Sequence, residues 1–500
     1  MFKEKPITAS VLSQRIDQAA GRSKADLVVK NVHLFNLATG ETSLTDIAVC
    51  GDTIVGTYSA YSGTREIDGR GLTAVPGFID THLHIESSLV TPGEFERGVL
   101  PRGTTTAICD PHEICNVLGK TGLEYFLASA EEMFLCTCYT HGNRRSHTEC
   151  SGFTRLYQTS QSYRIGGVHE FSRRHSQRPG LHEKLVLFSA EHIDGHSPLL
   201  NGLSLNAYLS AGISTDHEST EYEEAREKLA KGMHILIREG SITKDLRALA
   251  PLLSDTHSPF MSFCTDDRNP VEINREGHID FMTRKAVSLG VNPLSAYRAA
   301  SWSAAKAFGL RRKGLLAPGY TADIVLLEDI TECRVKQVIC QGKPVAEALF
   351  ASRKLPPPPG LTSVMMKEVV PSDFDIPVSS SDVPVIGIIP HKVITRNERC
   401  TIPVINGCGQ PDPTQDIMKI CVLKGTAKTE ASDAAFAGDL ASGKGHWLHQ
   451  SDTIATTSAQ SEPITKTWHS RLTACVKYRA DMWLYRTGRY WANLLCRSPG

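Results

Sequence analysis

The chain has 500 residues, and its 54 Lys and Arg residues balance its 54 Asp and Glu residues, so the formal net charge is zero. Such a balance provides no basic surface for nucleic acid or for an anionic membrane. No apolar run reaches the roughly 18 residues of a membrane span, and the length exceeds what one core usually serves. We therefore expect a cytoplasmic protein of two or three domains whose partner is a small molecule.

The first predicted elements are short strands. Residues 26–75 alternate β-rich runs with Gly and Asn turns, which is typical of a small antiparallel sheet. Similar runs return at 323–327 and 335–339, beyond the central part of the chain. One β-sandwich-like subdomain, residues 1–75 plus 311–354, is therefore expected from both flanks of a central unit.

The central unit, residues 76–310, alternates apolar strand candidates with helical patterns. Repeated β-α units of this kind predict an α/β fold, a TIM-type (β/α)8 barrel whose reactive residues lie in the loops that follow the strands. Four consecutive prolines within 355–360 indicate a stiff linker. A C-terminal α+β domain is expected over 361–500.

The most informative motif ends the first apolar strand of this unit. Residues 77–86 read Gly-Phe-Ile-Asp-Thr-His-Leu-His-Ile-Glu. Side chains at i and i+2 of a strand point to the same face, so His82 and His84 can bind one metal ion together. An isolated pair of this kind also arises by chance on a solvated strand, but the apolar run 72–79 before it indicates a buried parallel strand.

Four further polar clusters follow predicted strands, where a barrel places its reactive residues. Each alone is more often a solvated loop or a helix cap, but their shared position favours a metal site. Histidine offers neutral nitrogen ligands, and a late Asp can hold a metal ion and take a proton from water. The clusters are Asp110-Pro111-His112-Glu113, His192-Ile193-Asp194-Gly195-His196, Asp216-His217-Glu218 and Asp266-Asp267-Arg268.

Taken together, these motifs carry a resemblance to a known family. The Pro-Gly-Phe-Ile-Asp-Thr-His-Leu-His segment, the strand-end histidines, the late Asp and the split β-subdomain resemble the amidohydrolase superfamily. Within it, the clusters above, together with Arg238-Glu239-Gly240-Ser241, are similar to those of the bacterial adenine deaminase family. The resemblance covers residues 20–130 and 185–350.

The resemblance implies an activity and a cofactor. The activity is hydrolytic deamination of adenine to hypoxanthine and ammonia by a metal-activated hydroxide, a step of purine salvage. The implied cofactor is manganese or iron, as a dinuclear centre, and the implied assembly is a homodimer. By the same resemblance the first metal ion is held by His82, His84 and Asp266, and the second by His196 and His217.

The resemblance also implies roles around the metal ions. Asp266 fits the proton shuttle, while Glu218 or Glu113 could address the ring nitrogens, and His192 is either a packing residue or a ligand. The residues expected in catalysis are Asp266, Glu218, His217 and Glu113. The residues expected to bind the substrate are Asp110, His112, Glu113 and Asp267.

The chain departs from the family between two of these motifs. The family supplies a bridging Glu in an Ala-Glu-Phe-Met-Asn segment, whereas residues 134–182 are rich in Arg, His, Ser and Cys and show little periodicity. If 166–171 are encoded GGC GGA GTT CAT GAA TTC, reading one nucleotide later gives Ala-Glu-Phe-Met-Asn. We therefore interpret residues 134–182 as translated out of frame. Similar codon reasoning applies to about 424–500, because a shifted reading frame there gives a family-like His-Asp-Ser-His segment.

These departures leave three hypotheses for the function. The chain is an adenine deaminase, or it is the catalytically dead product of a frameshifted pseudogene. As a third alternative, it is another amidohydrolase that acts on a different cyclic amide or amine. Sequencing the gene separates the first two, and a panel of substrates tests the third.

Overall fold

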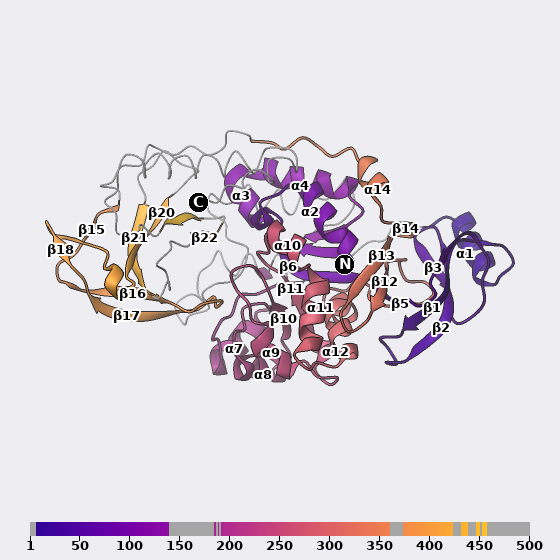
Figure 1. Ribbon diagram of the computed structural model, residues 1–500, viewed down its shortest axis with the longest axis horizontal. Helices are drawn as coiled ribbons and strands as arrows, with labels where there is room; N and C mark the ends of the chain where they lie inside the picture. The colour runs from indigo at the N-terminus through magenta and orange to yellow at the C-terminus, as the bar shows by residue number, and fades with distance from the viewer. Residues whose placement is uncertain are drawn as a thin grey trace, which may run out of the picture.

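The computed structural model describes residues 7–139, 185–186, 189, 192–360, 374–423, 432–438, 447–450 and 453–457. Most of 134–182 and of 424–500, the segments interpreted as out of frame, lies outside these residues. The described residues form three parts along the long axis of the molecule, with the first β-sheet at one end and the C-terminal strands at the other (Figure 1). No helix of the described ranges is long and apolar enough to cross a membrane.

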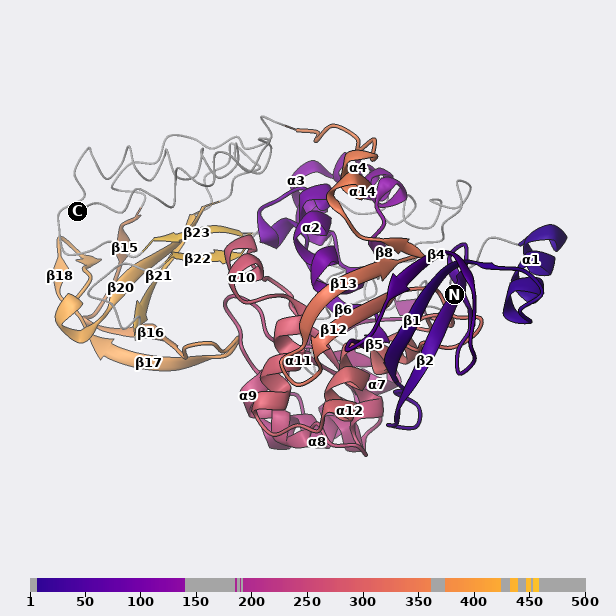
Figure 2. The same ribbon diagram turned by 45° about the vertical axis from the view of Figure 1, so that its right-hand side comes forward.

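The first part is an eight-stranded sheet built from both ends of the central unit (Figure 2). Strand β5 pairs antiparallel with β12, so that Val75 faces Val325 in the register. The strand order is β14-β13-β12-β5-β1-β2-β3, with β4 beside β1. The strands are β1 (Ala25–Phe35), β2 (Thr42–Cys50), β3 (Thr53–Gly56), β4 (Gly63–Asp68), β5 (Thr73–Pro76), β12 (Ile324–Asp329), β13 (Arg334–Cys340) and β14 (Lys343–Pro344).

The central part contains an arc of parallel strands. One parallel sheet has the order β6-β7-β8 and another β11-β10-β9, and a parallel bridge between Leu83 and Asp266 joins β6 to the end of β11. All six residues of β6 and of β7 are buried, as expected of strands covered on both faces. The strands are β6 (Phe78–Leu83), β7 (Thr104–Cys109), β8 (Cys136–Tyr139), β9 (Thr215–Asp216), β10 (His234–Arg238) and β11 (Met261–Cys264).

Helices follow these strands in the chain, so the α/β class is confirmed. After β6 to β8 come α2 (Pro92–Val99), α3 (His112–Leu118), α4 (Lys120–Glu132) and α7 (Gly202–Ser210). After β9 to β11 come α8 (Tyr222–Ala230), α9 (Leu246–Leu249), α10 (Pro270–Arg275), α11 (Ile279–Ser288), α12 (Pro293–Tyr297) and α13 (Ser303–Ala307).

One hydrophobic cluster connects the arc with the first sheet. Phe78 and Phe263, from β6 and β11, belong to it together with Tyr297 at the end of α12. Val75 and Val325 of the first sheet belong to the same cluster. Because these apolar side chains are removed from water together, the two parts stabilise each other, and the first sheet fixes where β6 begins.

The C-terminal part is a six-stranded sheet with the order β17-β16-β21-β20-β23-β22, beside a small sheet β15-β19-β18. Its described residues hold strands and a 3-10 turn at Pro413–Gln415, so the helices of the predicted α+β domain are not among them. The strands are β15 (Ile376–Pro377), β16 (Asp382–Ile388), β17 (Thr395–Thr401), β18 (Val404–Ile405), β19 (Cys408–Gly409), β20 (Met418–Leu423), β21 (Ser432–Gly438), β22 (Trp447–Gln450) and β23 (Thr453–Thr457). Helix α14 (Glu347–Ala351) precedes the proline-rich segment.

Candidate metal centre

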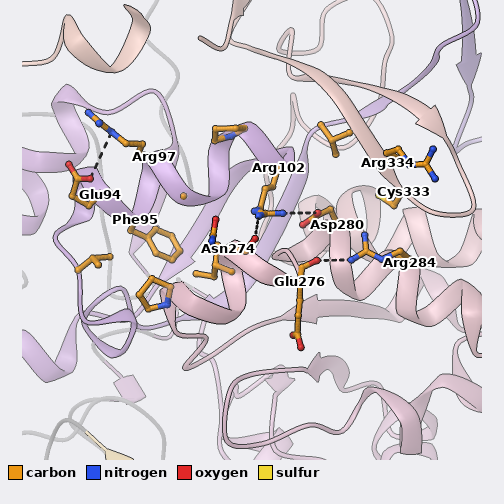
Figure 3. Close-up of a pocket in the computed structure, with 16 residues that line it drawn as sticks. Glu94, Phe95, Arg97, Arg102, Asn274, Glu276, Asp280, Arg284, Cys333 and Arg334 are labelled. Carbon is orange, nitrogen blue, oxygen red and sulfur yellow. Dashed lines mark hydrogen bonds and ion pairs between the residues drawn. The ribbon is translucent and has the colours of Figure 1, made fainter. Parts of the chain in front are cut away.

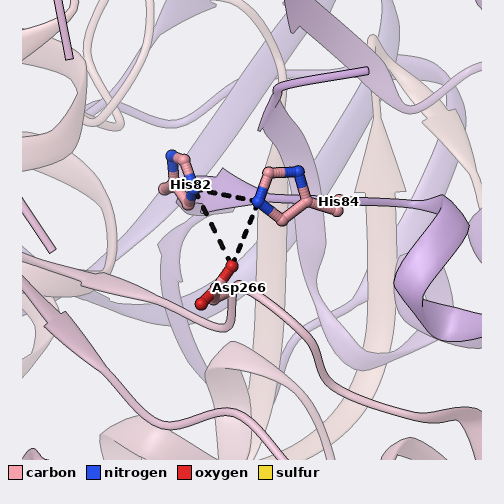
Figure 4. A group of neighbouring side chains, drawn as sticks. All are labelled: His82, His84 and Asp266. Carbon is pink, nitrogen blue, oxygen red and sulfur yellow. Dashed lines mark hydrogen bonds and ion pairs between the residues drawn. The ribbon is translucent and has the colours of Figure 1, made fainter. Parts of the chain in front are cut away.

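Three side chains meet where β6 and β11 end (Figure 4). The Nε2 atoms of His82 and His84 lie 3.3 Å apart, so both rings turn toward one point. The Oδ1 atom of Asp266 lies 3.2 Å from Nε2 of His84 and 3.8 Å from Nε2 of His82. Two imidazole nitrogens and one carboxylate oxygen form a donor set suited to a transition-metal ion.

The backbone holds Asp266 in this position. Its amide donates to the carbonyl of His82 at 2.9 Å, and its carbonyl accepts from the amide of His84 at 3.0 Å. Asp266 has a φ of 58°, a left-handed conformation that few residues other than Gly, Asn and Asp adopt readily. The two hydrogen bonds to β6 retain this conformation and aim the carboxylate at the histidines.

Arg238, the last residue of β10, balances the charge of this carboxylate. Its Nη1 atom donates to Oδ2 of Asp266 at 2.5 Å and lies 3.9 Å from Oε1 of Glu218. Burial opposes ionisation, but Arg238 and then His84 hold the pKa of Asp266 well below its usual range. Asp266 is therefore an ionised acceptor throughout the neutral range.

A second group of ligands lies beside the first. His196, His217 and Glu218 bring one donor atom each within 4.8 Å of one another. The rings of His82 and His217 stack at 3.7 Å between centroids, which places the two groups next to each other. Burial opposes ionisation of Glu218, but His196 and His217 hold its pKa well below its usual range. The structure thus brings together the residues predicted for two neighbouring metal ions.

Asp194 is the residue that the sequence did not single out. Its Oδ2 atom lies 2.6 Å from Nδ1 of His82 and 3.5 Å from Nδ1 of His217, so that it touches one histidine of each group. Neither contact has hydrogen-bond geometry, and all three atoms are buried without a hydrogen-bond partner among the described residues. The only signal in the sequence was its place two residues before His196 in a strand-end cluster.

Buried polar atoms without partners are costly unless a ligand satisfies them. The Nδ1 atoms of His82 and His217 and the Oδ2 atom of Asp194 form such a set. Two nitrogens and an acidic oxygen are ligands for a divalent cation, so the residues present fit a metal ion.

The cluster after β7 lies on the other side of His84. The Nδ1 atom of His84 lies 2.8 Å from the carbonyl oxygen of Asp110, a contact that fixes the ring and leaves Nε2 toward Asp266. His112 contacts the carboxylate of Asp110 at 3.0 Å, and the ring of His112 lies 4.6 Å from that of His84. Burial raises the pKa of Glu113 to about 8, so this carboxyl holds a proton at neutral pH.

Asp267 lies next to Asp266 but turns toward a different segment. Its Oδ2 atom accepts from the amide of Ile242 at 3.3 Å, and its buried Oδ1 atom has no partner among the described residues. Burial, and then the charge of Asp266, raise its pKa to about 7. Gly240 makes room for it, because a Cβ there would lie 1.9 Å from Oδ1 of Asp267 and 2.7 Å from the carbonyl of Thr265.

A buried network of ion pairs holds together the segments that carry the second group of ligands. The Nζ atom of Lys228 lies 3.0 Å from Oδ2 of Asp216 and 2.8 Å from Oε1 of Glu224. It also donates to the carbonyl of Ser197 at 2.6 Å and to the hydroxyl of Ser219 at 3.0 Å. These contacts join helix α8 to the segments that carry His196 and His217.

His192 does not belong to any of the candidate ligand groups found among the described residues. Its Nε2 atom lies 3.1 Å from the hydroxyl of Thr215, and its ring packs at 4.2 Å on Phe308. Of the two roles left open by the sequence, these contacts favour packing.

A cavity of about 560 Å³ opens elsewhere, between α2, α10 and the start of β13 (Figure 3). None of the candidate ligands lines it. Two of its arginines already have partners, since Arg102 donates to the carbonyl of Asn274 at 2.6 Å and Arg284 to that of Glu276 at 2.6 Å. The metal centre, rather than this cavity, is therefore the candidate functional site.

Comparison with known proteins identifies the class to which this centre belongs. The model of the amidohydrolase family matches residues 73–345, which contain every candidate ligand described above. The chain therefore belongs to the amidohydrolase family.

Three of the most similar curated relatives are all adenine deaminases. The chain is 49% identical to an adenine deaminase of Gluconobacter oxydans over 465 residues, which cover 90% of this chain and 82% of that protein. It is 47% identical to adenine deaminase 1 of Agrobacterium fabrum, over 89% of this chain and 80% of that protein. It is 50% identical to an adenine deaminase of a Methylobacterium species, over 82% of this chain and 75% of that protein. Within the family, the chain groups with the adenine deaminases, as the resemblance predicted.

Proposed function

We propose that this chain hydrolyses adenine to hypoxanthine and ammonia at the centre formed by His82, His84 and Asp266. The main support for the proposal is that these three residues lie close together beside His196 and His217. In addition, the sequence is 49% identical to that of an adenine deaminase. The identity extends over 90% of the chain, which favours this activity over the two alternatives.

The proposed cofactor is a pair of manganese or iron ions. His82, His84 and Asp266 would hold one ion, and His196 and His217 the other, with Asp194 as the carboxylate within reach of the second group. This assignment is supported by the two groups of converging donor atoms, His82 with His84 and Asp266, and His196 with His217 and Glu218. When bound, such ions polarise the substrate and lower the pKa of water toward neutrality.

The protein's own carboxyl groups divide into two kinds that suit the proton transfers. Asp266 and Glu218 are ionised, because cationic neighbours hold their pKa values low. Asp267 and Glu113 hold protons near neutral pH, because burial raises their pKa values to about 7 and about 8. Pairs of acids whose environments push their pKa values apart are typical of acid–base catalysis.

We assign the proton transfers accordingly. Asp266 takes one proton from the attacking water while the water oxygen bonds to C6 of the purine. It then delivers this proton to the exocyclic amine, which leaves as ammonia when the C6–N bond breaks, and the second water proton ends on N1 of hypoxanthine. Glu218 and Glu113 address the ring nitrogens, and Asp110, His112 and Asp267 complete the substrate site. Geometry supports this role for Asp266, since its carboxylate faces the Nε2 atoms of both His82 and His84.

We also propose that the arc of parallel strands belongs to an eight-stranded barrel. The observation in support is its continuous order, β8-β7-β6 joined through the Leu83–Asp266 bridge to β11-β10-β9. The candidate residues follow the strands, where such a barrel places its active site. Homodimer assembly and a cytoplasmic location remain predictions from the family resemblance.

The activity can be tested on the full chain, purified and loaded with Mn²⁺. Ammonia release from adenine is compared with release from adenosine, cytosine and guanine, and ring opening of a cyclic amide such as hydantoin addresses the third alternative. Asp266→Asn serves as the inactive reference. Turnover of adenine alone supports the proposal, whereas turnover of another substrate, or none, contradicts it.

Sequencing of the gene across codons 130–185 and 420–500 tests the frameshift hypothesis. If an in-frame Ala-Glu-Phe-Met-Asn segment appears, the shifts were errors in the sequence. If the printed sequence is confirmed, the Ala-Glu-Phe-Met-Asn segment of the family is missing from the chain. Among the described residues, Asp194 is a carboxylate that contacts a histidine of each group.

A further inference from the structure

A hairpin of the C-terminal part reaches the central part. Strands β16 and β17 pair along their whole length, from Asp382 opposite Thr401 to Ile388 opposite Thr395. The turn between them, 389–394, extends away from the C-terminal sheet toward the central strands, as both views show (Figures 1 and 2). His391 in this turn has a φ of 63°, and its carbonyl accepts from the amide of Lys244 at 3.0 Å.

Lys392, the next residue, makes the main contacts. Its ammonium donates to the carbonyl of Thr220 at 2.5 Å and to Oδ1 of Asp245 at 3.0 Å. Oε1 of Glu221 lies 3.5 Å away. One side chain from the C-terminal part thus joins two separate segments of the central part.

Both contacted segments continue directly into the metal centre. Thr220 stands two residues after Glu218, in the segment that carries His217. Asp245 is hydrogen-bonded to the end of β10, because its amide donates to the carbonyl of Arg238 at 2.9 Å. Arg238 in turn holds Asp266. Three successive contacts therefore connect Lys392 to the proposed proton acceptor.

This ion pair differs from an ordinary surface pair. The side chain of Asp245 is fully buried and that of Lys392 is 17% exposed. The second carboxylate oxygen of Asp245 has no hydrogen-bond partner among the described residues. Lys392 donates a hydrogen bond to the first oxygen and, together with the charge of Arg238, compensates the buried carboxylate. Buried pairs are screened little, and removal of one partner leaves the other uncompensated.

We propose that Lys392 is a positioning residue through which the C-terminal domain completes the active site. It fixes the segment of His217 and Glu218 against the segment that follows Arg238, and so sets the position of Glu218 and of the Arg238–Asp266 pair. The inference rests on the proposed function for its kinetic consequence, but the docking itself does not depend on which substrate is used.

Three variants of the full chain test the proposal. Lys392→Met removes the ammonium and keeps the length of the side chain, and Lys392→Arg restores a cation. Lys392→Met combined with Asp245→Asn breaks the contact without leaving a buried charge, which protects folding. Arg399→Ala is the matched control, because Arg399 is paired with Asp382 inside the same hairpin and is 61% exposed.

Two measurements are made on each variant after loading with Mn²⁺. Hydrogen exchange of peptides covering 216–222 and 239–247 reports the docking without any need for activity. Steady-state kinetics with adenine, scaled to the bound metal, separates kcat from KM. A misplacement of about 1 Å can cost on the order of 100-fold in rate, so we expect kcat to fall about 10- to 100-fold.

The proposal predicts faster exchange in both segments and a lower kcat for Lys392→Met and for the double variant, at unchanged metal content. Lys392→Arg should restore most of both, and Arg399→Ala should resemble the parent. Unchanged exchange in the double variant overturns the docking role. Faster exchange with an unchanged kcat overturns the positioning role. If the parent chain turns over no adenine, the proposed function fails and the exchange data alone decide the docking.

Discussion

Replacement of Lys228 by Met tests the buried network under the metal centre. Lys228 is fully buried in helix α8, as are the side chain of Asp216 and most of that of Glu224. Met keeps the volume of the aliphatic stem, so that packing changes little, but it removes the cation that compensates both carboxylates. The change therefore isolates the electrostatic contribution.

The magnitude follows from burial. Removing one partner of a buried ion pair costs about 3–5 kcal/mol, because the remaining charge stays in a poorly solvated place. Lys231→Met is the matched control at the end of the same helix, since Lys231 pairs with Glu227, which is 38% exposed. Loss of such a pair costs about 0–1 kcal/mol.

The assay is equilibrium unfolding in urea, followed by far-ultraviolet circular dichroism and repeated with Mn²⁺ present. We expect a large loss of stability for Lys228→Met and a small one for Lys231→Met. We also expect Lys228→Met to bind less metal, because the segments of His196 and His217 lose a shared support. If both variants lie within about 1 kcal/mol of the parent, the network does not support the site as argued.

Two further predictions concern Asp194 and His234. Asp194→Asn should weaken Mn²⁺ binding about 10- to 100-fold in calorimetric titration, because Asp194 contacts a histidine of each group; unchanged binding of both ions would contradict its role in the centre. Burial, and then His192, lower the pKa of His234 to about 3, while its Nε2 atom contacts the hydroxyl of Ser262 at 2.7 Å. Below about pH 6.5 the unfolded state therefore binds a proton on this histidine that the folded state does not bind. The free energy of unfolding consequently decreases as the pH falls. His234→Gln should remove about 2 kcal/mol of the loss between pH 7 and pH 5, and an unchanged pH dependence of unfolding would refute this.

The sequence predicted those parts of the site that follow from local periodicity and strand position. His82 and His84 converge because alternate residues of a strand share a face, and Asp266 meets them because parallel strands end at one edge. The family prediction is confirmed by the comparisons. The assignment of catalytic and ligand roles stays a prediction.

The contacts that the sequence could not reveal depend on tertiary packing. Asp194 touches His82 across a long stretch of chain, and nothing in its own motif distinguishes it from a loop carboxylate. Lys392 lies in the turn of a hairpin, and its partner Asp245 directly precedes a short helix. Nothing in the local sequence of either residue indicates that the two are paired. Both become visible once the strands and the C-terminal hairpin have positions in space.

The central claim is that His82, His84 and Asp266 form a metal-dependent site for adenine deamination. The most direct measurement is ammonia release from adenine by the full chain before chelation, after removal of metal, and after return of Mn²⁺, with Asp266→Asn in parallel. We predict turnover that disappears with the metal, returns with Mn²⁺ and is absent in Asp266→Asn. Turnover that survives chelation, or a metal-loaded and folded parent chain that does not act on adenine, would contradict the account.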